Sequence, residues 1–148
     1  MISTEFLERW KARLEEGARL VFEEMPLAEV AGTHCDIGDG VAVRAGLKPI
    51  GFNWELLDAE GAPGEPRAAL SVLTRALTDD MEYPKQSWLG EDGAASCAQD
   101  FVALFERPRT IISNRIEDYW NPLSDARIEW AFVGFDAERA VLMLVMRD

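Results

Sequence analysis

The chain has 148 residues, the length of one ordinary domain, so we expect a single globular domain spanning residues 1–148. Hydrophobic residues make up 48% of the chain and charged residues 28%, a composition that excludes a disordered acidic tail. The formal net charge is −12 and the pI is near 4.5. This charge argues against nucleic acid and anionic membranes as partners, because both require a clustered basic surface.

The first residues contain no basic segment followed by an apolar one, so we expect no signal peptide and a cytoplasmic location. The longest apolar run, Ala140 to Met146, is too short to cross a bilayer. Cys35 and Cys97 lie far apart in the sequence and form no CxxC pair. Without an export signal, the two cysteines are expected to be buried thiols rather than a disulfide.

The N-terminal half predicts one helix followed by strands. Apolar residues recur every three or four positions from Thr4 to Glu24, which indicates an amphipathic helix. Val30 to Ile37 and Val41 to Val43 then predict the two arms of a hairpin, with Gly38-Asp39-Gly40 as its turn. Ile50 to Leu56 alternates apolar and polar residues and is typical of a strand.

The C-terminal half predicts three helices and a closing hairpin. Helical spacing covers Arg67 to Met81 and Ala95 to Glu106, and Pro108 is placed to open a further helix. Ile128 to Val133 alternates as a strand should. Ala140 to Met146 is apolar at every position, which predicts a central strand covered on both faces.

These elements together predict an α+β fold. We expect an antiparallel sheet of about five strands with about four helices, because successive strands are joined by short turns. The N-terminal amphipathic helix should pack on the sheet, the helices should share one face, and a β-hairpin should end the chain.

The triplet His34-Cys35-Asp36 is the strongest candidate for catalysis. A nucleophilic cysteine needs a histidine base within hydrogen-bonding reach, and neighbouring residues on a strand point to opposite faces. His34 with Asp36 and Asp39 also falls short of a zinc site, and the Asp-Gly turn does not match a calcium loop. Nucleotide-binding and hydrolase motifs are absent from the sequence. We therefore assign no catalytic residue, no metal ligand and no cofactor, and expect a binding protein rather than an enzyme.

The acidic residues concentrate in the middle of the chain. Between Glu55 and Glu106 there are eleven acidic and only three basic residues. Within this stretch, residues 79–92 combine carboxylates with two aromatic side chains in a segment that reads as a loop. Aromatic side chains anchor interfaces, and surrounding acids attract a basic partner. The candidate partner-binding residues are Asp79, Asp80, Glu82, Tyr83, Trp88, Glu91 and Asp92.

The leading hypothesis is an acidic protein-binding module that engages a basic protein through the surface around residues 79–92. A small cytoplasmic immunity or antitoxin protein of bacteria, which inhibits a toxin enzyme by occupying its basic cleft, has this physical profile. One alternative is a small hydrolase or ligand-binding enzyme that uses carboxylates with His34. The other is a structural subunit of a homo-oligomer, in which the apolar C-terminal strand or the tryptophans contact another copy; monomer and homodimer both remain open.

Overall fold

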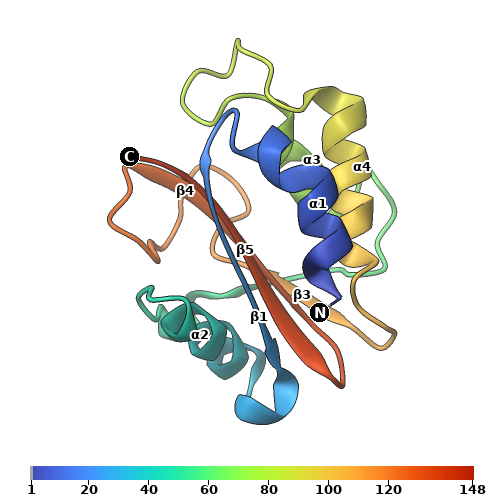
Figure 1. Cartoon of the computed structure of the whole chain (residues 1–148), viewed down its shortest axis with the longest axis vertical. Coiled ribbons are helices and arrows are strands. Elements are labelled where there is room, and N and C mark those ends of the chain that lie inside the picture. The colour runs from blue at the N-terminus through green and yellow to red at the C-terminus, as the bar shows by residue number, and fades with distance from the viewer. Residues whose placement is uncertain (1) are drawn as a thin grey trace.

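The computed structural model describes residues 2–148, and its centre is a five-stranded antiparallel sheet in the order β1-β5-β4-β3-β2 (Figure 1). The strands are β1 (Arg19–Pro26), β2 (Glu55–Leu57), β3 (Thr110–Ser113), β4 (Ile128–Phe135) and β5 (Arg139–Arg147). The α-helices are α1 (Ser3–Leu14), α2 (His34–Arg44), α3 (Ala69–Thr78) and α4 (Gly90–Val102). Two short 3₁₀ helices, η1 (Leu27–Glu29) and η2 (Gly51–Asn53), complete the elements. This arrangement confirms the predicted α+β class.

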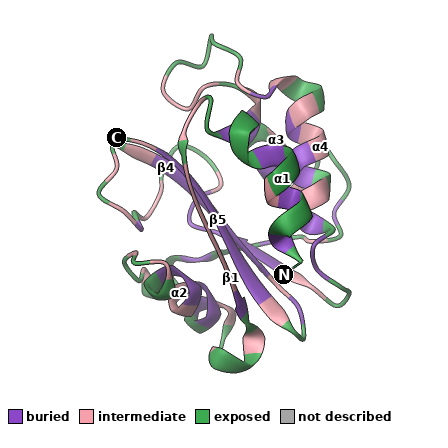
Figure 2. Cartoon of the chain, in the orientation of Figure 1, coloured by how far each residue is buried: buried purple, intermediate pink, exposed green. Residues whose placement is uncertain are grey.

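The sheet lies between two helical layers, which corrects the expectation that the helices share one face (Figure 1). Alternate residues of β5 enter different cores: Met143 packs with α1, α3 and α4, whereas Leu142 and Leu144 pack with α2. The same alternation divides β4, where Phe132 faces the three helices and Val133 faces α2. A sheet covered on both faces explains why β4 and β5 are almost continuously buried (Figure 2).

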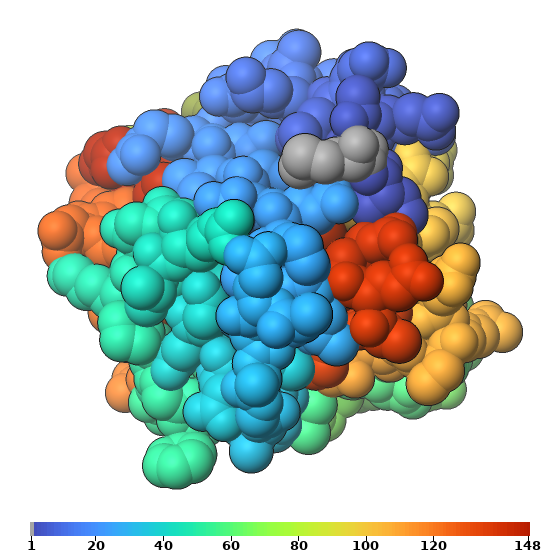
Figure 3. Space-filling model, turned by 60° about the horizontal axis from the view of Figure 1, so that its bottom comes forward, coloured from blue at the N-terminus to red at the C-terminus, as the bar shows by residue number. Residues whose placement is uncertain are grey.

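The C-terminal hairpin is confirmed, and β5 is an inner strand because β1 and β4 pair with it on either side. The outer edge of the sheet on this side belongs to β1, whose atoms reach the surface between α1 and α2 (Figure 3). The C-terminal strand therefore has no free edge with which to pair with another copy of the chain. Within residues 2–148, no helix combines the length and the apolar character needed to cross a membrane.

The N-terminal helix is confirmed, but it ends at Leu14 instead of Glu24. The residues that follow form β1, in which Phe22 faces α1 and Val21 faces α2. Phe22 stacks on Phe6 of α1 with ring centroids 5.5 Å apart, so the two halves of the expected helix pack against each other. Residues such as Val21 and Phe22 fit a strand that packs on both faces better than the outside of a helix.

The predicted hairpin at residues 30–43 is wrong, because this segment contains α2. Thr33 begins the helix with a capping box: its hydroxyl accepts from the Asp36 N–H at 3.3 Å, and the Asp36 carboxylate accepts from the Thr33 N–H at 2.9 Å. Gly38 is inside the helix rather than in a turn. A Cβ at Gly38 would lie 2.5 Å from the Trp54 indole, so glycine permits this close contact.

Other segments also differ from the sequence prediction. The expected helix 67–81 is confirmed as α3 but is shorter, and the expected helix 95–106 is confirmed as α4 but begins at Gly90, so residues 90–92 belong to a helix rather than to the expected loop. Of the expected strand 50–56, only Glu55 and Leu56 belong to β2, because η2 turns the chain beforehand and leaves Phe52 exposed while Trp54 is buried. The segment after Pro108 forms β3 instead of a helix, and its Ile111 and Ile112 face the two different cores. Paired β-branched residues that pack on opposite sides favour a strand.

Candidate functional site

Residues 79–89 connect α3 to α4 and form a closed, hydrogen-bonded loop. The Asp80 N–H donates to the Gln86 carbonyl, and the Gln86 N–H donates to the Tyr83 carbonyl, both at 2.8 Å. At the end of the loop, the Trp88 N–H donates to the Thr78 carbonyl at 2.9 Å. The loop therefore presents its side chains from a defined backbone, which makes it possible to assign each carboxylate a role.

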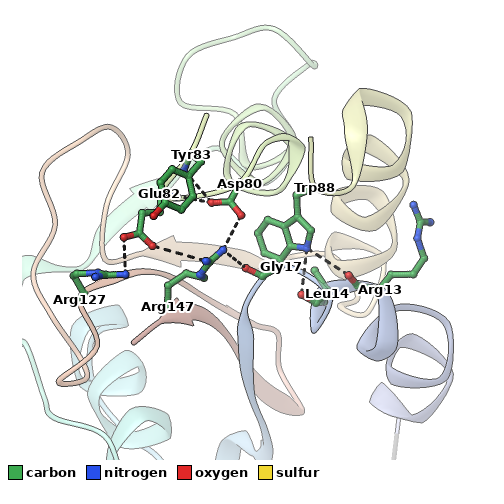
Figure 4. A network of polar contacts seen from close by, with 9 residues as sticks. All are labelled: Arg13, Leu14, Gly17, Asp80, Glu82, Tyr83, Trp88, Arg127 and Arg147. Atoms are coloured by element: carbon green, nitrogen blue, oxygen red, sulfur yellow. Dashed lines mark hydrogen bonds and ion pairs between the residues drawn. The ribbon is translucent and has the colours of Figure 1, made fainter. Parts of the chain in front are cut away.

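The Asp80 side chain faces inward and holds the loop to the end of β5 (Figure 4). It accepts from the N–H groups of Glu82 and Tyr83 at 2.9 Å, and from Arg147 Nη1 at 2.7 Å. Burial alone would raise the pKa of this carboxyl, but the two backbone donors and Arg147 outweigh burial and lower it. Asp80 is thus committed to the fold, which removes it from the candidate partner surface.

Glu82 is committed in the same way, because its carboxylate lies between two arginines of the same chain (Figure 4). Arg127 Nη2 lies 2.5 Å from Oε1, and Arg147 Nη2 lies 3.8 Å from Oε2. The Glu82 side chain is only 21% exposed. A basic partner would have to displace both arginines to reach this carboxylate.

Trp88 also turns toward the protein (Figure 4). Its indole lies on Gly17, and its Nε1–H donates to the Leu14 carbonyl at 3.2 Å, at the end of α1. The ring therefore covers the C-terminal end of α1, where the Leu14 carbonyl also accepts from the N–H groups of Gly17 and Ala18. Trp88 is half-buried and holds the loop to α1, so it is not the accessible anchor that the sequence suggested.

Asp79 and Glu91 have a different environment, because both line a groove between α3 and α4 with a volume of about 540 Å³. On α3, Leu70, Thr74 and Thr78 follow one another at four-residue spacing along its wall. Ala95 lies one turn after Glu91 on α4, and Pro63 and Pro66 close the other end. Neither acid forms an ion pair with a basic group of residues 2–148; Arg75 also lines the groove, but its Nη2 donates to the Ile116 carbonyl at 2.7 Å. We call this hollow the α3–α4 groove.

Glu91 and Asp79 differ in how their carboxylates interact with the helix dipoles. Glu91 lies in the first turn of α4, where a carboxylate interacts favourably with the helix dipole. Asp79 directly follows the last residue of α3, at the negative end of that dipole, where a carboxylate is unfavourable. Asp79 therefore contributes nothing evident to stability. Asp92, beside Glu91, and Tyr83 are exposed and complete the part of the predicted site that faces solvent.

Ion pairs within the chain neutralise much of the acidic middle stretch. Glu60 pairs with Arg107 and Arg109, and Asp100 pairs with Arg9. Glu55 pairs with Arg67, in addition to the pairs of Asp80 and Glu82. Most of these arginines come from outside residues 55–106, so a count along the sequence overstates the charge that the surface presents. Sequence reasoning missed the walls of the groove, although the four-residue spacing of Leu70, Thr74 and Thr78 was a usable signal.

The cysteines, His34 and Asp39 were the residues to consider for catalysis, and they are either far apart or already hydrogen-bonded within the fold. Cys97 packs in the core with α1, α3 and α4, whereas Cys35 packs on the opposite face of the sheet, next to His34 in α2. Burial, with a smaller contribution from Asp100, raises the pKa of the Cys97 thiol to about 12, which suppresses the reactive thiolate. The Asp39 carboxylate accepts from the Ile50 and Gly51 N–H groups and from the Trp54 indole. In the part of the chain that the structure describes, no three His, Cys, Asp or Glu side chains are close enough to hold a metal ion.

The chain matches no protein-family model, and the searches of curated proteins and of solved structures return no significant match.

Proposed function

We propose that this chain is an acidic protein-binding module that engages a basic protein along the α3–α4 groove. The observation that carries the proposal is that Asp79, at the end of α3, and Glu91 of α4 line one groove and form no ion pair among residues 2–148, while Arg75 of the same groove donates to the Ile116 carbonyl. The wall supplied by Leu70 and Ala95 offers apolar contact, and the loop that begins at Asp79 carries the exposed ring of Tyr83. Apolar contact bordered by unpaired charge is the arrangement that binds and orients a charged partner.

The class with this profile that we favour is a cytoplasmic immunity or antitoxin protein. The net charge of −12 speeds association with a basic surface, and occlusion of that surface would inhibit an enzyme that binds an anionic substrate. Among residues 2–148 the hydrolase alternative, which uses carboxylates with His34, has less support, because the Asp39 carboxylate in the same helix as His34 already accepts from the Ile50 and Gly51 N–H groups and the Trp54 indole.

The test compares two doubly substituted variants with equal net charge. Asp79→Lys with Glu91→Lys reverses both carboxylates of the groove, whereas Glu8→Lys with Glu16→Lys reverses two exposed acids of α1 and the turn after it. Each variant serves as bait on source-cell lysate at low salt, and the association rate of the captured basic protein is then measured at several ionic strengths. We expect the groove variant to associate about tenfold more slowly and with a weaker salt dependence.

The α1 variant should associate at a rate close to that of the unmodified chain. Equal slowing in the two variants would show that only the overall charge matters, and the groove would lose its role. Retention of full binding by the groove variant would remove the groove from the interface altogether.

A further inference from the structure

The loop that follows β3 carries a buried guanidinium. Arg115 and Trp120 face each other across this loop, and the Asn121 N–H donates to the Asn114 carbonyl at 3.3 Å, which closes it. Arg115 is only 8% exposed. Its guanidinium carbon lies 4.1 Å from the Trp130 ring centroid and 5.0 Å from that of Trp120, so both indoles are within cation–π distance of the guanidinium.

The charge of Arg115 has no carboxylate partner. Within residues 2–148, no acidic oxygen lies within 4.0 Å of the guanidinium. The charges of Asp118 and Glu129 act on Arg115 without forming an ion pair with it. The Glu129 carboxylate accepts instead from Asn114, Leu123 and Ser124. Buried charges in proteins are normally paired, because leaving them unpaired is costly. The indoles and backbone carbonyls near Arg115 compensate the charge only in part.

Hydrogen-bond donors of this guanidinium remain free. Nε donates to the Glu117 carbonyl at 2.7 Å and Nη1 donates to the Glu129 carbonyl at 3.2 Å. A guanidinium has five N–H donors, so three have no acceptor in the described chain. Nη2 makes no hydrogen bond there, and it is not among the fully buried unsatisfied atoms, which places it at a solvent-reached edge.

A pocket of about 450 Å³ opens beside this guanidinium, and its walls carry both signs of charge. Arg67 and Glu55 form an ion pair of 3.3 Å on one wall. Glu117 and Tyr119 belong to the loop of Arg115, and Tyr119 is 84% exposed. Asn53 and Asn121 add amide groups. The pocket thus offers an unused cation, a carboxylate without an ion-pair partner among residues 2–148, and an aromatic ring.

We propose that this pocket binds a small zwitterion of the α-amino acid class. The ligand carboxylate hydrogen-bonds the free N–H groups of Arg115, its ammonium group lies toward Glu117, and its side chain packs on Tyr119 and Ile116. A guanidinium edge matches a planar carboxylate with two parallel hydrogen bonds. A simple anion is repelled by a chain of net charge −12, whereas a zwitterion carries no net charge and uses both signs on the walls.

Three matched probes test the proposal: L-leucine, L-leucine methyl ester, which lacks the carboxylate, and 4-methylpentanoate, which lacks the ammonium group. Binding is followed by NMR through the indole N–H signals of Trp120 and Trp130, which flank Arg115. We expect saturable shifts with L-leucine and much weaker binding of the two other probes. Tight binding of the methyl ester would overturn the role of Arg115, and equal binding of 4-methylpentanoate would overturn the zwitterion class.

Two variants separate ligand binding from a purely structural role. Arg115→Lys keeps the positive charge but not the two parallel donors, and it should weaken L-leucine binding about 10- to 100-fold. Glu117→Gln changes an exposed side chain, so it should leave the fold intact and weaken L-leucine binding a few-fold while sparing 4-methylpentanoate. If Arg115→Lys disrupts folding, Glu117→Gln decides the question. Unchanged L-leucine binding in Glu117→Gln, or no binding of L-leucine to the unmodified chain, would refute the proposal.

Discussion

Replacing Gly17 by alanine tests whether Trp88 is a structural side chain or an accessible binding anchor. The added Cβ would lie 2.6 Å from Cδ1 and Nε1 of Trp88, so the indole would have to move. Overpacking of this kind costs about 1–3 kcal/mol, and a displaced indole also loses its hydrogen bond to Leu14, worth about 1 kcal/mol. Alanine also lowers the conformational entropy of the unfolded chain, which offsets about 0.4–1 kcal/mol of this destabilisation. We expect the free energy of unfolding to fall by about 2 kcal/mol.

Urea titrations followed by far-UV circular dichroism measure this loss, and Trp88→Leu supplies the matched background. The smaller leucine leaves room for a Cβ at residue 17, so Gly17→Ala should be neutral or slightly stabilising there. The two substitutions should therefore be coupled by about 2 kcal/mol. Additive effects in the double variant would mean that the indole is not held against Gly17, and Trp88 would then return to the accessible partner surface.

Three further predictions concern buried polar groups. In the folded chain the pKa of Asp80 lies below its unfolded value, so this carboxylate stabilises the fold at neutral pH and that contribution disappears as the pH falls through the folded pKa. Asp80→Asn should therefore lower the urea midpoint most at neutral pH, and a pH-independent difference would contradict this. Glu129→Gln should lower the free energy of unfolding in urea by about 2 kcal/mol. Both Glu129 oxygens accept hydrogen bonds, so in either orientation the glutamine NH₂ would face groups that are themselves donors; an unchanged free energy of unfolding would contradict these hydrogen bonds. The Cys97 thiol, whose pKa is raised to about 12, should react with a thiol reagent only after unfolding, and rapid labelling of the native chain would contradict its burial.

The strongest periodic patterns in the sequence predicted the parts of the fold that depend on local burial. Ala140 to Met146 is apolar at every position because β5 contacts both cores and pairs on both sides. The helix over residues 69–78 follows from its apolar stripe in the same way. Each of these patterns records the surroundings of an element directly, so no knowledge of distant contacts was needed.

The helix α2 was missed because two local signals disagreed. Gly38-Asp39-Gly40 is typical of a turn, whereas Thr33 and Asp36 have the spacing of a capping box. The glycines are explained by contacts that the sequence does not reveal, since Gly38 lies against Trp54 and Gly40 lies against Val30. Tertiary packing thus decided between helix and turn.

The candidate site was only partly predictable because charge was counted along the chain and not in space. Residues 55–106 contain three basic residues, yet Arg147 binds Asp80, Arg127 binds Glu82, and Arg109 binds Glu60. These arginines lie beyond the acidic stretch and reach it only because β5, the loop before β4 and the start of β3 fold back toward it. Asp79 and Glu91 differ from these acids in that neither forms an ion pair within residues 2–148, and Arg75, which lines the same groove, donates to the Ile116 carbonyl instead. A cation from another molecule could pair with these two acids as Arg127 and Arg147 pair with Glu82 and Asp80. Substitutions at Asp79 and Glu91 therefore test binding at the groove more specifically than a change in total charge does.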